Sequence, residues 1–203
     1  MQTLKADIRK RILTQSRKLF LEKGFRETTT RDIAERSGVV LSSLYRYFSS
    51  KNDIFACLVQ PAAKSLEDLL ERHHNSDLND ISIIQSENYT EVTLNEYLDA
   101  IQRNRISLKL LLLKAEGSSY AGFKEEYVNR ATRMVLAWFR SMKAKYPGMN
   151  TQVSDFFIHL NNVWMFTLLE EILMHDLPED ETRSVLLDYI QFEYTGWKKM
   201  MKV

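Results

Sequence analysis

The sequence is poor in residues that interrupt helices and strands and in residues that cross-link a chain. Its 203 residues include six glycines, three prolines and one cysteine. So few glycines and prolines argue against a turn-rich β fold. The single cysteine, Cys57, excludes an internal disulfide and is typical of a protein from a reducing compartment.

The sequence also lacks long apolar segments. No run approaches the ~20 apolar residues that a membrane-spanning helix needs. The start, Met1-Gln2-Thr3-Leu4-Lys5, has no apolar region of a secretory signal. We therefore expect a cytoplasmic protein with no membrane partner.

Motifs for catalysis and metal binding are missing as well. The sequence has no glycine-rich phosphate loop, no nucleophile elbow and no CxxC pair. Glu171 and His175 are spaced i, i+4, but no third metal ligand is evident, and His73-His74 lacks ligand spacing. We predict no catalytic residue, no metal site, no cofactor and no enzyme activity.

Charge is distributed unevenly along a chain whose net charge is only +1. Residues 1–54 carry 12 lysines and arginines against 6 acidic residues, and the remainder carries 16 against 21. A basic N-terminal part on an acidic body suits a protein that presents one end to DNA, although a solvated basic face is the alternative explanation.

Helical spacing of apolar residues dominates what remains. Ile8, Ile12, Leu19 and Phe20 recur at helical intervals, and Gly24 is expected to close that first helix. Pro61 should kink or break a later helix, because proline has no amide hydrogen to donate. We predict an all-α protein, with further helices near residues 94–103, 104–116, 121–145, 152–175 and 179–200.

Two short helices near the N-terminus form a predicted helix-turn-helix. Thr29 and Asp32 resemble a capping box that starts one helix, and Gly38 supplies the turn. Leu44 and Phe48 should share the buried face of the next helix. The side chains left to contact bases or phosphates are Thr29, Thr30, Arg31, Leu41, Ser42, Ser43, Tyr45, Arg46, Tyr47 and Lys51.

Residues 8–55 resemble the N-terminal domain of the TetR family of bacterial transcriptional regulators. The resemblance rests on Leu19-Phe20, Gly24-Phe25, Thr28-Thr29, Asp32-Ile33-Ala34, Gly38-Val39, Leu44-Tyr45, Tyr47-Phe48 and Lys51. It implies a repressor-like homodimer whose N-terminal heads each bind half of a palindromic, double-stranded DNA operator. The rest of each subunit would be a helical domain that encloses a pocket for an unknown small-molecule effector.

One position departs from the family pattern. The family usually has Ser or Thr just after the Gly-Val turn, where it caps the recognition helix. Here Val40 takes that place and Leu41 follows, so that Ser42 offers the first capping hydroxyl. Loss of a side-chain cap costs roughly 1 kcal/mol of helix stability.

The resemblance also directs attention to the apolar residues of the body. Family pockets lie between the middle helices, which makes the following residues pocket candidates: Tyr97, Leu111, Tyr120, Phe123, Met134, Trp138, His159 and Trp164. The last two helices of the family form a dimer interface, which makes these residues interface candidates: Phe156, Phe157, Leu160, Val163, Leu186, Tyr189, Ile190, Phe192 and Trp197. Ordinary core is the alternative explanation for each of them.

The sequence thus predicts a DNA-binding domain at residues 1–50 and a ligand-binding and dimerisation domain at residues 51–203. The predicted function is that of a ligand-responsive transcriptional regulator acting as a repressor. The alternative is a dimeric helical interaction protein of the same fold that no longer binds DNA.

Overall fold

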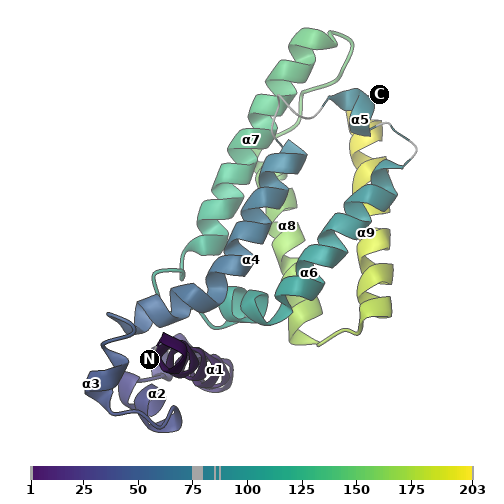
Figure 1. Ribbon diagram of the computed structural model, residues 1–203. Coiled ribbons are helices and arrows are strands. Elements are labelled where there is room, and N and C mark those ends of the chain that lie inside the picture. The colour runs from purple at the N-terminus through teal and green to yellow at the C-terminus, as the bar shows by residue number, and fades with distance from the viewer. Residues whose placement is uncertain (1, 75–79, 85, 87, 203) are drawn as a thin grey trace. The chain divides into compact units, whose positions relative to one another are not determined.

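A computed structural model describes residues 2–74, 80–84, 86 and 88–202. These residues form nine helices and no strand (Figure 1), which confirms the predicted all-α class. None of the described helices is long and apolar enough to cross a membrane. The helices are α1 (Gln2–Glu27), α2 (Thr30–Arg36), α3 (Leu41–Leu44), α4 (Lys51–His74), α5 (Ile81–Ile84), α6 (Tyr89–Leu113), α7 (Phe123–Lys145), α8 (Asp155–Met174) and α9 (Glu179–Met201).

The chain folds into two compact units. The first unit comprises Met1–Lys64 and Asn104–Phe123, and the second comprises Ser65–Arg103 and Lys124–Val203. Helices α4 and α6 therefore contribute residues to both units. The functional division into residues 1–50 and 51–203 remains a prediction.

Aromatic residues fill the core of the first unit. The Phe20 ring lies 5.8 Å from that of Phe25 and 5.2 Å from that of Phe55, measured between centroids. Gly24 interrupts α1 with a φ of 79°, a conformation that glycine adopts without steric cost. The interruption allows Phe25 to turn into the core, and it falls where the sequence predicts the end of the first helix.

The end of α6 and the loop after it complete the first unit. The Phe25 amide donates to the Lys114 carbonyl at 2.9 Å, and the Ser119 amide donates to Asn52 Oδ1 at 2.9 Å. Arg26 and Glu116 form an exposed ion pair at 2.7 Å. A backbone hydrogen bond to α1 and a backbone-to-side-chain hydrogen bond to α4 thus hold this distant segment in place.

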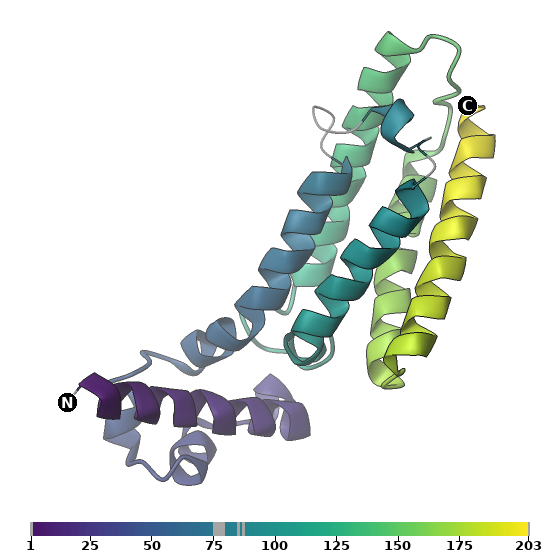
Figure 2. The ribbon, with the colours of Figure 1, turned by 45° about the vertical axis from the view of Figure 1, so that its right-hand side comes forward.

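The second unit is a bundle built from α5, α7, α8, α9 and parts of α4 and α6. Helices α8 and α9 run side by side in opposite directions in both views (Figures 1 and 2). The buried Tyr127 hydroxyl of α7 donates to the Leu66 carbonyl of α4 at 3.0 Å. Burial raises the pKa of this phenol, so it remains a neutral donor that links the two helices.

An expected break is absent from α6, and α4 is continuous through Pro61, where the sequence predicts a kink or a break. The helices expected at residues 94–103 and 104–116 form the single helix α6, because no glycine or proline separates them. Pro61 lies inside α4, which continues to His74. Between α4 and α6 lies the short helix α5, while residues 75–79, 85 and 87 lie outside the described part.

Candidate nucleic-acid interface and effector cavity

The start of α2 is fixed by reciprocal hydrogen bonds. Thr29 Oγ1 accepts from the Asp32 amide at 3.1 Å, and Asp32 Oδ2 accepts from the Thr29 amide at 3.0 Å. The backbone hydrogen bond from Thr29 lowers the pKa of Asp32. This is the predicted capping box, and it sets where Thr30 and Arg31 lie on the first turn.

Helix α3 is a single turn without a side-chain cap. Val40 is its N-cap residue and makes no side-chain hydrogen bond to the helix. Gly38, with a φ of 62°, makes the turn between α2 and α3. Leu44 is buried, and so is Phe48, which follows the end of α3, as the sequence predicts. Burial of these two side chains, rather than a cap, anchors the segment.

The predicted DNA-contacting residues gather at the start of α2 and along α3 and the turn after it. Tyr45 is 49% exposed, and its hydroxyl donates to Thr30 Oγ1 at 3.4 Å. Arg46 is exposed and donates from Nη2 to Ser43 Oγ at 2.8 Å. Of the other predicted contacts, Thr29, Arg31 and Ser42 are exposed, whereas Leu41 and Tyr47 are half-buried.

Lys51 is placed differently from the other predicted contacts. Its ammonium donates to the carbonyls of Phe25 and Thr28, each at 2.7 Å, and lies 4.1 Å from the centroid of the Phe25 ring. Burial lowers the pKa of this amine. Lys51 thus binds carbonyls near the end of α1, and its contact with DNA stays a prediction.

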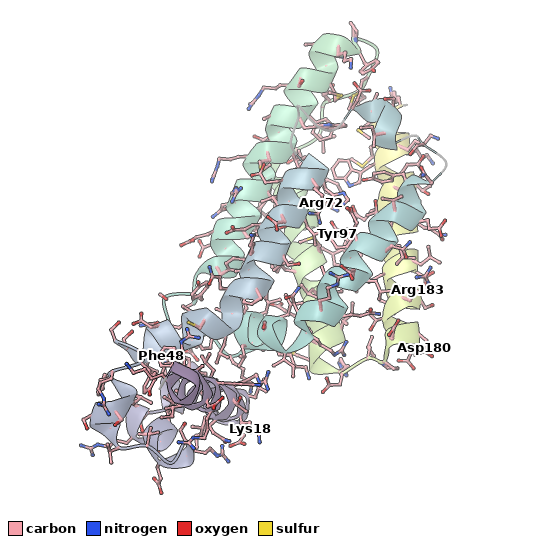
Figure 3. The ribbon with its side chains drawn as sticks, in the orientation of Figure 1. Lys18, Phe48, Arg72, Tyr97, Asp180 and Arg183 are labelled. Atoms are coloured by element: carbon pink, nitrogen blue, oxygen red, sulfur yellow. The ribbon has the colours of Figure 1, made fainter. Side chains whose placement is uncertain are left out.

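A cavity of about 180 Å³ lies within the second unit. Residues from α4, α6, α7, α8 and α9 line it, and the described lining contains no lysine or arginine. Aromatic side chains make up much of the wall: Tyr89, Tyr97, Trp138, Phe139, Tyr189, Tyr194 and Trp197. Figure 3 shows Tyr97 on α6 beside α4.

Glu193 on α9 is the one carboxylate in the described lining. Its two oxygens each lie 2.7 Å from Asn161 Nδ2, and Oε2 also accepts from the Trp197 indole at 2.8 Å. These three hydrogen-bond contacts come from neutral donors. The carboxylate is therefore positioned without being neutralised by them.

His73 forms another part of the lining. Its ring stacks on Tyr97 with a centroid separation of 5.5 Å, and Nε2 lies 2.8 Å from Glu96 Oε2. Burial lowers the pKa of His73, outweighing the opposite effect of Glu96. Burial also raises the pKa of Tyr97. Both groups are therefore neutral at pH 7.

Two of the predicted pocket residues, Tyr97 and Trp138, line this cavity. Leu111, Tyr120 and Phe123 belong to the first unit, and Met134, His159 and Trp164 lie in the second unit outside the lining. Glu193 is not among the predicted pocket residues, although Tyr189, Glu193 and Trp197 recur at four-residue steps. That spacing places a carboxylate on an aromatic stripe and could have identified it.

The predicted interface residues fall into two groups. Phe156, Phe157, Leu160, Trp164 and Phe192 are exposed, with Phe156 at 67% and Phe192 at 63%, and Val163 is half-buried. Trp164 on α8 packs its ring edge-on against Phe192 on α9 at 5.4 Å. By contrast, Leu186 and Ile190 are buried, and Tyr189, Ile190 and Trp197 line the cavity.

The residue pair with metal-ligand spacing is an exposed contact on α8 and its C-cap. His175 Nε2 lies 3.2 Å from Glu171 Oε2, and both side chains are more than half exposed. No group of three metal-ligating side chains occurs in the part of the chain that the structure describes.

The N-terminal segment matches known regulators. Residues 12–58 match the sequence model of "Bacterial regulatory proteins, tetR family". A curated relative from Bacillus subtilis (strain 168), the uncharacterized HTH-type transcriptional regulator YvkB, is 33% identical over 63 residues. That match covers 31% of this chain and about a third, 33%, of the relative's length.

Solved structures extend the likeness to the whole fold. SCO3833, a member of the TetR transcriptional regulator family from Streptomyces coelicolor A3, aligns with a TM-score of 0.61 over 92% of this chain and 90% of its own, at 16% identity. NalD, the secondary repressor of the MexAB-OprM multidrug efflux pump in Pseudomonas aeruginosa, aligns with a TM-score of 0.57 over 92% and 94%, at 19% identity. At these identities the likeness establishes the fold.

The proteins that match this chain form one group, and the matched residues include the helix-turn-helix of α2 and α3. The matched proteins are transcriptional regulators. Residues 12–58 therefore carry the N-terminal domain of the TetR family of bacterial regulatory proteins, and the fold of the chain is similar to those of solved TetR-family regulators.

Proposed function

We propose that the protein is an effector-responsive repressor that binds a palindromic operator as a homodimer. The observation that carries the proposal is the capped α2 followed by α3, with Tyr45 and Arg46 exposed and Leu44 buried. This arrangement suits a helix-turn-helix that enters the major groove. The basic surplus of residues 1–54 supplies attraction to phosphates.

The exposed apolar residues of α8 and α9 support the dimer. Phe156, Phe157, Leu160, Trp164 and Phe192 present large apolar groups to solvent on two helices that run side by side (Figure 2). Large exposed apolar side chains gathered on neighbouring helices are typical of an interaction site. A two-fold dimer would match a palindromic operator with half-sites roughly 34–36 Å apart.

The cavity supports the effector response. An aromatic-walled cavity with a few polar groups is typical of a small-molecule site. Helix α4 supplies residues to the unit that holds the cavity and to the unit that holds α2 and α3. In the proposed mechanism, the effector favours one of two conformations and thereby changes the spacing of the two DNA-binding heads.

A gel-shift assay with DNA that flanks the protein's own gene tests the proposal. We expect a specific complex that survives competitor DNA and weakens with salt, with a log–log slope near roughly −0.9 per phosphate contact. Arg46→Ala should weaken specific binding by ~1–3 kcal/mol if the guanidinium contacts a base.

Arg140→Ala is the matched control, because Arg140 is an exposed arginine on α7. It should leave the complex unchanged. Equal effects of the two substitutions would argue against a base contact by Arg46. If no specific complex forms at either low or high salt, the result would favour the alternative, a helical dimer that does not bind DNA.

A further inference from the structure

The cavity of the second unit has an unbalanced charge. Its described lining holds one carboxylate, Glu193, and no lysine or arginine. The exposed Lys198 places its ammonium 5.7 Å from the centroid of the Tyr194 ring but does not line the cavity. His73, the one imidazole of the lining, is neutral at pH 7 because burial lowers its pKa.

This charge pattern selects among ligand classes. An anionic ligand would meet the Glu193 carboxylate with no cation in the described lining to offset the repulsion. A neutral apolar ligand would cover that carboxylate without replacing the water it loses, which is costly. A cationic ligand would offset the carboxylate's desolvation with a direct ion pair.

The aromatic wall of the cavity also favours a cationic ligand. Tyr97, Tyr189 and Trp138 present π systems to the cavity, and burial raises the pKa of both phenols, so they stay neutral. The faces of neutral aromatic rings attract cations, most strongly when water is excluded. Asn161 and Trp197 fix the carboxylate in place by donating to it, and its oxygens retain lone pairs for another donor or cation.

We propose that the effector of this protein is a monovalent organic cation, a quaternary or protonated amine, held by Glu193 within the aromatic wall of the cavity. The inference rests on the proposed effector-binding role of the second unit. Glu193 is the counter-ion, and the tyrosine and tryptophan rings surround the ligand's alkyl or aryl groups.

Titration calorimetry on the full-length protein with three matched probes tests the charge preference. The probes are phenyltrimethylammonium, its neutral isostere tert-butylbenzene, and the anion benzenesulfonate. We expect the cation to bind at least about tenfold more tightly than the isostere, and benzenesulfonate to give no binding heat.

Substitutions on α9 then test the role of Glu193. Glu193→Gln should weaken cation binding about tenfold or more and leave tert-butylbenzene binding unchanged. Glu193→Asp keeps the charge and should retain the preference for the cation. Glu181→Gln is the matched control, because Glu181 is exposed on the first turn of the same helix.

Equal affinity for the cation and the isostere would overturn the inference, as would a cation that does not bind or that binds Glu193→Gln as tightly as the unsubstituted protein. The probe comparison on the unsubstituted protein decides the matter even if a variant fails to fold. Calorimetry requires no DNA, so the two proposals are tested separately. If the protein binds its operator but not the cation, only the inference about the effector is wrong. If the protein binds the cation through Glu193 but forms no specific complex with DNA, the proposed regulator function is wrong instead.

Discussion

At the scale of single residues, Lys51 shows a charged side chain used for architecture. Its ammonium reaches three carbonyls, those of Phe25, Arg26 and Thr28, just where α1 ends and the chain turns towards α2. Hydrogen bonds from a charged donor are stronger than those between neutral groups. Lys51 thereby joins the start of α4 to the end of α1.

Replacing Lys51 with methionine should lower the stability of the protein. Lys51→Met keeps the length and apolar stem of the side chain but removes the donor, so we expect a loss of ~1–2 kcal/mol in the free energy of unfolding. Urea denaturation measures it. Lys64→Met, an exposed change on the same helix, serves as the control and should have little effect. A similar loss in both variants would show that the carbonyl contacts contribute nothing specific.

Asp80 offers a pH-dependent prediction in the second unit. It accepts from Lys145, from the Ser82 amide at 3.0 Å and from the Tyr146 hydroxyl at 2.8 Å. The bond from Lys145, followed by those from Ser82 and Tyr146, holds the pKa of Asp80 well below its ordinary value of 3.8. A carboxyl whose pKa is depressed on folding stabilises the fold above its unfolded pKa, and this contribution is lost as the pH falls.

Asp80→Asn should therefore lower the melting temperature at pH 7, and the difference from the unsubstituted protein should shrink as the pH falls below 3.8. Thermal melts from pH 7 to pH 2 measure this. The exposed Asp68→Asn on α4 is the control and should show no such trend. A difference that stays constant over the whole range would contradict the assignment.

At the scale of elements, α2 and α3 differ in how they begin. Helix α2 has a capping box, whereas Val40 leaves α3 without a side-chain cap. Val40 is 67% exposed, so a polar side chain there meets no steric barrier from the core. The position can therefore be changed to test how much the cap contributes.

Val40→Thr should stabilise the protein by ~0.5–1 kcal/mol, because a threonine hydroxyl can accept from the amides of the first turn of α3. Denaturation compared with the unsubstituted protein isolates the hydroxyl, since threonine differs from valine only by a hydroxyl in place of one methyl group. Val40→Ala, which removes both methyl groups and supplies no acceptor, is the second comparison. Equal stability of the threonine and alanine variants would mean that α3 gains nothing from a cap.

The elements were largely predictable, because local patterns determine them. Thr29 and Asp32 predict the start of α2, and the spacing of apolar residues predicts the bounds of α7, α8 and α9 to within a few residues. The break expected between residues 103 and 104 is absent from α6, because no glycine or proline enforces one. The cavity was harder to predict, because it depends on five helices packing so that Glu193, His73 and Asn161 meet across long separations.

At the scale of the whole molecule, the exposed aromatic residues of α8 and α9 predict the oligomeric state. Replacing Phe156 and Phe192 together with glutamate should convert the proposed dimer into a monomer, because charges would be buried without partners at the interface. Light scattering coupled to gel filtration measures the mass. Val92→Glu, an exposed apolar position on α6, is the control and should leave the mass unchanged. A dimer that persists in the double variant would locate the interface elsewhere.

The brevity of α3 has a consequence for how this regulator could evolve. Only Leu44 of its four residues is buried, and the predicted DNA-contacting side chains around it contribute little to the core. Substitutions of exposed residues usually change stability by less than about 0.5 kcal/mol. Mutations at Ser42, Tyr45 and Arg46 can therefore accumulate with little penalty to folding. Operator preference should diverge between descendants of this protein faster than the scaffold that presents it.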